Sequence, residues 1–217
     1  MKRKTRKNFY TAIFVLATFI LWTIAIKFID VSSIGPNASS VGFASFNSVF
    51  HNFTGVHMTL YTITDWLSIV PICFVIAFGI LGFIQLINRK NILKVDYDIL
   101  VLGGFYVTVM AMYVLFEMIV VNYRPVLIEG VLEASYPSST TMLVMCIMPT
   151  TIMQLNRRIK SIRLKGMVSF ILSLFTAFMV VGRLISGVHW LSDIIGGALL
   201  SIGLVMMYKA FVGLKTE

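Results

Sequence analysis

Long runs of apolar residues, separated by short polar connections, dominate this chain. Six runs can be marked, over residues 9–29, 67–87, 99–121, 139–155, 167–186 and 190–213. Each is close to the roughly 20 residues that an α-helix needs to cross the hydrocarbon core of a bilayer. The pattern predicts an all-α, integral membrane six-helix bundle, with residues 1–217 forming a single membrane domain.

Composition excludes the main alternative, a water-soluble domain. Hydrophobic residues make up 58% of the chain and charged residues only 12%, whereas soluble domains contain about 25% charged residues. The first apolar run is too long for a secretory signal and no small-residue cleavage site follows it, so we expect it to be retained. Cys73 and Cys146 lie inside apolar runs without metal-ligand spacing, so we expect neither a disulfide framework nor a metal.

The positive charge of the chain lies in alternate connections. There are 18 Lys and Arg residues against 9 Asp and Glu residues, which gives a formal charge of +9. Of the 18, 15 lie at the two ends of the chain or in two of its loops: Lys2, Arg3, Lys4, Arg6, Lys7, Arg89, Lys90, Lys94, Arg157, Arg158, Lys160, Arg163, Lys165, Lys209 and Lys215. The charge therefore indicates membrane topology, and the expected partner is the lipid bilayer and not nucleic acid.

Short cytoplasmic loops hold the positive charge of membrane proteins, so this distribution predicts an orientation. Both termini and the loops over 88–98 and 156–166 are expected in the cytoplasm. The segments 30–66, 122–138 and 187–189 are then expected on the outer side. The protein is predicted to be a multi-pass protein of the cell membrane.

The first outer segment contains an amphipathic helical pattern. Phe43, Phe46, Phe50 and Phe53 recur at the spacing of one helix face, and Gly55 is expected to end that helix. Such a helix either lies along the membrane surface and admits lipid, or packs over the mouth of the bundle.

Polar and charged residues, which are energetically costly in or beside a membrane, lie at the predicted outer ends of the later spans. Arg124, Arg183, His189 and Asp193 are expected at one depth, where charged residues are functional candidates by default. Arginine presents a rigid fork of donors that matches phosphate oxygens, so Arg124 and Arg183 suit a phosphoryl group. The alternative is that each arginine side chain extends to the membrane–water interface or pairs with an acidic side chain.

Two further features fit an anion site. The helix predicted to start at Ser138, Ser139 and Thr140 would aim free backbone N–H groups outward, although a plain helix cap uses the same residues. His189 and Asp193 are four residues apart, so on a helix the carboxylate can hold the imidazole in one tautomer. A histidine held in this way can attack phosphorus and form a phosphohistidine, whereas the alternative is a hydrogen-bonded histidine of the core.

These residues carry a resemblance to a known family. Arg124-Pro125, the run Tyr136-Pro-Ser-Ser139, and Arg183 spaced from His189 and Asp193 resemble the three motifs of the type 2 phosphatidic acid phosphatase superfamily, which are six-span lipid phosphatases. The resemblance implies that His189 is the nucleophile, Asp193 its orienting acid, and Arg124 and Arg183 the phosphate-binding residues. It implies no cofactor and no metal.

The sequence departs from the family motifs at four positions. Glu117 stands at the family's lysine, Ser139 at its glycine, Thr140 at its second-motif histidine and Gly182 at its third-motif serine. By analogy, the missing histidine is the general acid for the leaving group, and threonine cannot serve as one near neutral pH. A phosphate leaving from a diphosphate needs a proton less than an alkoxide does, so a lipid diphosphate, such as a polyprenyl diphosphate, is favoured.

Glu117 is expected to modulate the site, because it puts a negative charge beside a phosphate. Pairing with Arg124 is the favoured outcome; a protonated carboxyl and a cation site are the others.

The leading hypothesis is a membrane phosphatase that hydrolyses a lipid phosphate or diphosphate at the outer face. Its rival is a non-catalytic relative that binds or transports a phosphorylated lipid, suggested by Glu117 and Thr140. A transporter or structural membrane protein unrelated to phosphate would leave the clustered outer charges unexplained.

Overall fold

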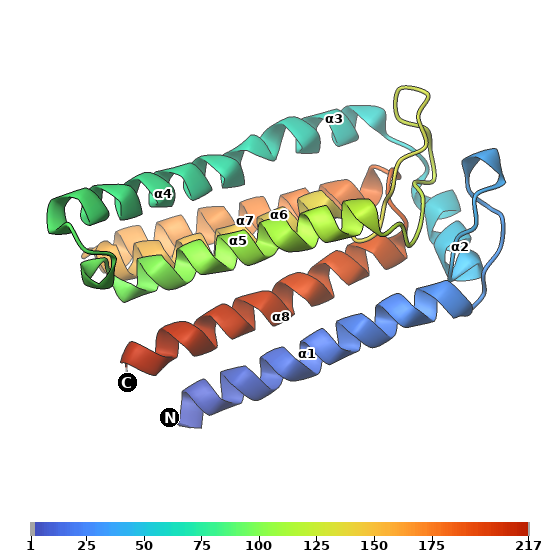
Figure 1. The fold of residues 1–217 in the computed structure, drawn as a ribbon. Coiled ribbons are helices and arrows are strands. Elements are labelled where there is room, and N and C mark those ends of the chain that lie inside the picture. Colours follow the sequence, from blue (N-terminus) through green and yellow to red (C-terminus); the bar gives the residue numbers. More distant parts are fainter. Residues whose placement is uncertain (1–2, 217) are drawn as a thin grey trace.

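A computed structural model describes residues 3–216, and it confirms the predicted all-α fold. The long helices run side by side (Figure 1): α1 (Arg3–Phe28), α4 (Ile69–Arg89), α5 (Tyr97–Met118), α6 (Ser139–Arg158), α7 (Ile162–Ile185) and α8 (Leu191–Thr216). The shorter α2 (Ala44–Thr54) and α3 (Met58–Leu67) lie toward one end, and the 3-10 turns η1 (Pro36–Ala38) and η2 (Ile92–Lys94) lie in connections.

Among the described residues, five helical segments are long and apolar enough to cross a membrane: Arg3–Phe28, Met58–Arg89, Tyr97–Met118, Ile162–Ile185 and Leu191–Lys215. The predicted span over 139–155 forms helix α6, which is not among the five because it is too polar. The buried residues of α6 include Thr140, Thr141, Thr150, Thr151 and Gln154. Since α6 packs against α7, α8, α4 and α5, these polar side chains face protein and not lipid.

The second span begins earlier than the predicted start at residue 67. Helix α3 starts at Met58 and meets α4 at Ser68, so the two together form one apolar segment of 32 residues. Helix α3 packs against α7, where the methyl-bearing side chain of Thr64 lies against Gly182. This extra length brings residues of α3 to the end of the bundle where the predicted site residues lie.

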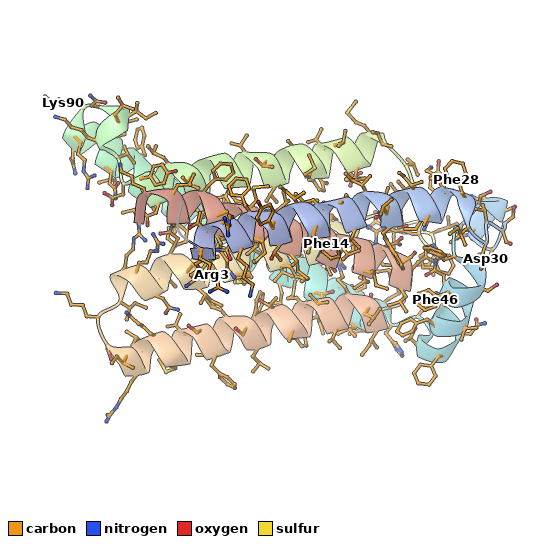
Figure 2. The ribbon with its side chains drawn as sticks, turned by 90° about the horizontal axis from the view of Figure 1, so that it is seen from below. Arg3, Phe14, Phe28, Asp30, Phe46 and Lys90 are labelled. Carbon is orange, nitrogen blue, oxygen red and sulfur yellow. The ribbon has the colours of Figure 1, made fainter. Side chains whose placement is uncertain are left out.

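The two ends of the bundle differ in their charge. Both chain termini lie at the same end as η2 and the α6–α7 connection, as Figure 1 shows. Arg3 and Lys90 lie at that end, whereas Phe28, Asp30 and Phe46 lie at the other (Figure 2). Of the 15 basic residues assigned to the alternate connections, Lys2 lies outside the described residues and the other 14 belong to the first end; the remaining three basic residues of the chain are Lys27, Arg124 and Arg183.

Helix α2 lies across the second end of the bundle, steeply inclined to the long helices (Figures 1 and 2). One face is buried through Ala44 and Asn47, while Phe53 on another face is 86% exposed. Phe43 precedes the helix in a left-handed conformation and packs on the ring of Trp22, with 4.9 Å between ring centroids. Helix α2 therefore covers the bundle end with one face and keeps an apolar outer face.

The turn between α7 and α8 is pinned to the connection between α2 and α3. Gly55 ends α2 as predicted, and the backbone N–H of His57 donates to the Ser186 carbonyl at 2.9 Å. Gly187 has a φ of +69°, and a Cβ atom there would lie 2.0 Å from the Gly55 carbonyl oxygen. Only glycine fits this crossing of two backbones without displacing one of them.

Replacing Gly187 with Ala is expected to destabilise the protein by about 2–4 kcal/mol, from a left-handed residue and a steric overlap. The measurement is the melting temperature in detergent. Gly103→Ala is the matched control, because a Cβ there meets nothing within 4 Å and the residue is helical. A Gly187→Ala protein with the same melting temperature as the Gly103→Ala control would contradict the close contact between the backbones of Gly187 and Gly55.

Candidate active site

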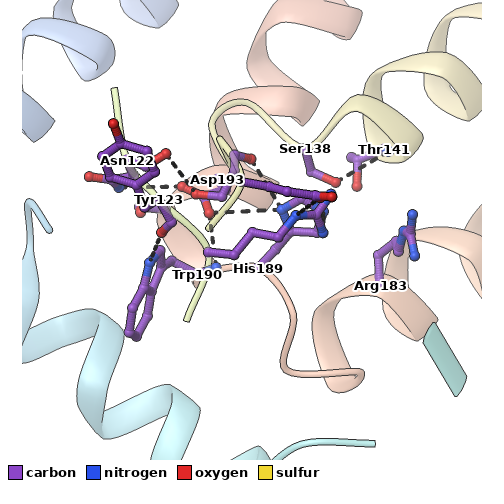
Figure 3. A network of polar contacts seen from close by, with 12 residues as sticks. Asn122, Tyr123, Ser138, Thr141, Arg183, His189, Trp190 and Asp193 are labelled. Carbon is purple, nitrogen blue, oxygen red and sulfur yellow. Dashed lines mark hydrogen bonds and ion pairs between the residues drawn. The ribbon is translucent and has the colours of Figure 1, made fainter. Parts of the chain in front are cut away.

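The four predicted site residues meet at the second end of the bundle, although they come from different elements. Arg183 lies near the end of α7, His189 in the α7–α8 turn, Asp193 in the first turn of α8, and Arg124 in the 119–138 loop. Figure 3 shows His189 and Asp193 together, with Arg183 on the neighbouring helix. The convergence that the sequence suggests is present in the fold.

The contacts of His189 define its tautomer. Its Nδ1 atom lies 3.1 Å from the Ser135 carbonyl oxygen, which can only accept a hydrogen bond, so Nδ1 carries the hydrogen. Its Nε2 atom then holds the lone pair, and it faces the Arg124 Nη1 donor at 3.4 Å. The ring is therefore presented in the form in which Nε2 is a nucleophile.

The protonation state of His189 agrees with this form. The side chain is buried, with 3% of the residue exposed. Burial, followed by the positive charges of Arg124 and Arg183, holds the pKa of His189 well below the ordinary value of 6.5. The imidazole is therefore neutral at physiological pH.

Asp193 is fully buried and lies behind the imidazole. Its Oδ2 atom is 3.9 Å from Nδ1 of His189 and accepts the backbone N–H of Trp190 at 2.9 Å. Its Oδ1 atom accepts from the Asn122 amide at 3.4 Å. The Ser135 carbonyl is thus the nearer acceptor for the ring, and Asp193 supplies negative charge from slightly farther away.

Arg124 pairs with Glu133 and not with Glu117, the partner favoured from the sequence. Its Nε atom lies 3.0 Å from Oε2 of Glu133, and its backbone N–H also donates to the Glu133 carbonyl at 3.0 Å. The prediction was wrong because α5 ends at Met118, so Glu117 and Arg124 do not share a helix face. Glu117 is exposed, and Tyr113 is its polar neighbour.

Arg183 is held by residues that include one that the sequence did not indicate. Its Nη2 atom donates to Asp65 Oδ1 at 2.9 Å and to Thr140 Oγ1 at 2.7 Å. Its guanidinium also lies over the ring of Tyr61, 4.6 Å from the centroid. The signal for Asp65 was a lone carboxylate beside an apolar run, which is costly unless it is paired.

The three residues at the start of α6 have different roles. Ser138 is buried, its Oγ atom caps the helix by accepting from the Thr141 N–H at 3.5 Å, and its own N–H donates to the Asp193 carbonyl at 3.1 Å. Ser139 and Thr140 instead line a cavity. Ser138 is therefore a helix cap, and only its two successors face a ligand space.

That cavity has a volume of about 760 Å³ and is bounded by α4, α5 and α6. One end is polar, and its charged lining residues are Asp65, Glu117, Arg124, Glu133 and Arg183. The remaining wall is largely apolar and includes Ile72, Val75, Val109, Met110, Leu143 and Ile147. A small pocket lined by His189 adjoins this cavity, and the two share Tyr113, Glu117, Ala134, Ser139 and Met142.

Comparison with known proteins supplies the family. A model of the PAP2 superfamily matches residues 75–217, which hold all of the site residues predicted from the sequence. The chain belongs to the PAP2 superfamily of membrane phosphatases. This membership confirms the resemblance drawn from the motifs.

A solved structure is similar along nearly the whole chain. It is the first transmembrane PAP2 type phosphatidylglycerolphosphate phosphatase from Bacillus subtilis, with a TM-score of 0.67 and 19% sequence identity. The similarity covers 95% of this chain and 98% of that one. No curated protein matches this chain. The shared fold is that of a multi-pass membrane protein.

The neutral state of His189 is open to direct measurement. In ¹⁵N-histidine spectra, the ring signals of His189 are expected to stay those of the neutral Nδ1–H tautomer as the pH is lowered through the ordinary histidine pKa of 6.5. The unfolded chain takes up this proton first, so His189 lowers the stability of the fold as the pH falls below 6.5. His189→Gln identifies the signals by their loss, and a titration near 6.5 would contradict the burial argument.

Proposed function

We propose that this protein hydrolyses a phosphorylated membrane lipid through a phosphohistidine at His189. The observation that carries the proposal is the neutral His189, whose Nε2 atom faces Arg124, a residue that lines the polar end of a cavity with apolar walls. Membership in the PAP2 superfamily supports the reaction class. The substrate is proposed from this chain's own cavity and charges.

The shape of the cavity suits an amphipathic substrate. Its volume of about 760 Å³ lies within the roughly 300–1,000 Å³ of typical ligand sites. A phosphoryl group would lie between Arg124 and Arg183, and an acyl or prenyl chain would follow the apolar wall between α4 and α5. The apolar wall reaches as far as Ile147, two turns into α6.

In the proposed first step, Nε2 of His189 attacks the phosphorus and the bond from phosphorus to the leaving oxygen breaks. The two guanidinium groups stabilise the negative charge on the phosphoryl oxygens. The positive charge that develops on the imidazole is stabilised by the Ser135 carbonyl and by Asp193. In the second step water attacks the phosphorus, which releases inorganic phosphate and restores the neutral histidine.

The leaving group is proposed to be a phosphate, so that the favoured substrate is a polyprenyl diphosphate. Thr140, at the position of the family's second-motif histidine, accepts a hydrogen bond from Arg183 and has no acidic proton to give near neutral pH. Losing a general acid costs about 10²- to 10⁴-fold, most where the leaving group is a poor one such as an alkoxide. A diphosphate avoids most of that cost.

We further propose that the site opens on the outer side of the cell membrane. It lies at the end of the bundle opposite both termini and the basic loops. The excess of positive charge at the far end favours a cytoplasmic position for that end.

The direct test measures phosphate release by the purified protein from a polyprenyl diphosphate and from phosphatidic acid. Release is expected to be faster from the diphosphate, and His189→Ala is expected to abolish it, since the variant lacks the Nε2 atom that faces Arg124. His57→Ala is the matched control because His57 is exposed and lines neither the cavity nor the small pocket. Turnover retained by His189→Ala would contradict the mechanism.

The rival function is a non-catalytic carrier or binder of phosphorylated lipid. The observation that favours it is the charge at the polar end of the cavity, where three carboxylates accompany the two arginines. Bound lipid without phosphate release from either substrate would support the rival.

Replacing Thr140 with His restores an acid at this position. Hydrolysis of phosphatidic acid is expected to rise by at least about 10-fold, and that of the diphosphate by much less, because only the alkoxide needs the proton. The ratio of the two kcat/KM values is the measurement. Thr140→Val, which only removes the acceptor for Arg183, is the control, and an equal change for both substrates would refute the leaving-group argument.

A further inference from the structure

Both hydrogen-bonding contacts of the His189 ring come from one short antiparallel ladder. Tyr123 pairs with Ala134, the Arg124 N–H donates to the Glu133 carbonyl at 3.0 Å, and the Ser135 N–H donates to the Asn122 carbonyl at 2.9 Å. One strand supplies Arg124, which faces Nε2, and the other supplies the carbonyl that faces Nδ1. The position of the imidazole therefore depends on how this ladder is held.

Asn122 connects the ladder to the remaining group behind the ring. The residue is 1% exposed, and its carbonyl accepts both the N–H and the hydroxyl of Ser135, at 2.9 and 3.1 Å. Its side-chain amide donates to Oδ1 of Asp193 at 3.4 Å, and its side-chain oxygen accepts the Gly42 N–H at 3.1 Å. The backbone of Asn122 thus holds Ser135, whose own carbonyl faces Nδ1 of His189, and its side chain contacts Asp193 (Figure 3).

The direction of the amide is fixed by its two partners. Gly42 offers a backbone N–H, so the oxygen of the Asn122 amide must point to it, and the nitrogen must point to Asp193. A carboxylate at this position would keep the contact with Gly42 and would place a second negative charge against Asp193. In a buried site such a pair of like charges is strongly unfavourable.

We propose that Asn122 is a positioning residue for His189. Its side chain holds the Asp193 carboxylate and ties the ladder that carries the Ser135 carbonyl to Gly42, so that the two acceptors together keep the hydrogen on Nδ1 and leave the Nε2 lone pair toward the phosphoryl site. The role in turnover rests on the proposed function, whereas the effect on the tautomer does not.

A second buried asparagine provides a matched control. Asn47 is 0% exposed, donates to the Gly42 carbonyl at 2.8 Å and to Ser192 Oγ at 2.9 Å, and accepts the Ser192 N–H at 3.1 Å. It therefore binds the same loop and the same first turn of α8 as Asn122 does. None of its hydrogen bonds reaches Ser135 or Asp193, so its loss tests a structural role alone.

The experiment records ¹⁵N-histidine spectra and phosphate release for Asn122→Asp, Asn122→Ala and Asn47→Asp. Both Asn122 variants are expected to move the His189 ring away from the pure Nδ1–H tautomer. They are also expected to lower kcat about 10- to 100-fold, the range typical of partners that orient metal-bound histidines, with KM unchanged. Asn47→Asp is expected to keep the wild-type tautomer.

The two readouts separate the two claims. A wild-type tautomer in a folded Asn122 variant, or the same spectral change in Asn47→Asp, would overturn the positioning role. Failure of both Asn122 variants to fold would also overturn it, since the residue would then be structural. A shifted tautomer in a protein that releases no phosphate even as wild type would keep the positioning role and reject the proposed function.

Discussion

The site depends on keeping two guanidinium groups charged at the edge of a membrane-embedded bundle. Arg183 is only 2% exposed, and a bare cation there would be costly, so Asp65 lies 2.9 Å from it. Arg124 has Glu133 in the same role at 3.0 Å. Both carboxylates reach into the cavity, so a phosphoryl group would replace or join them as counter-charge for the arginines.

This requirement explains two features of the fold. Helix α3 extends the second span beyond the apolar run, which brings Asp65 to Arg183. The 119–138 loop folds back on itself as a short ladder, which brings Glu133 to Arg124 and the Ser135 carbonyl to His189. The same two segments therefore supply the counter-charges of the arginines and a partner for the His189 ring.

The sequence predicts most of the helices and the meeting of Arg124, Arg183, His189 and Asp193, but few of the contacts that hold these residues in place. Apolar runs identify spans wherever a helix faces lipid, but α6 is surrounded by protein and is free to be polar, so its run is the least apolar. Spacing alone brings Arg183, His189 and Asp193 together, because a short turn joins their two helices.

The partners of these residues lie far away along the chain and could not be predicted. Asp65 is 118 residues from Arg183 along the chain. The partner from Ser135 is a backbone carbonyl, which every residue has, so the sequence does not mark it. The predicted pair of Glu117 and Arg124 assumed a continuous helix, which ends at Met118. Nothing in the sequence marked Asn122 as a site residue, because asparagine is common in loops and its burial follows only from the tertiary fold.

The central claim is that His189 carries the phosphoryl group. The most direct measurement mixes the protein with a polyprenyl diphosphate labelled at the terminal phosphate, quenches within milliseconds, and maps the label by mass spectrometry. The account predicts an acid-labile phosphoryl group on His189 that forms and decays at the rate of turnover, and that is absent from His189→Ala. Turnover without a labelled histidine, or label on another residue, would contradict it.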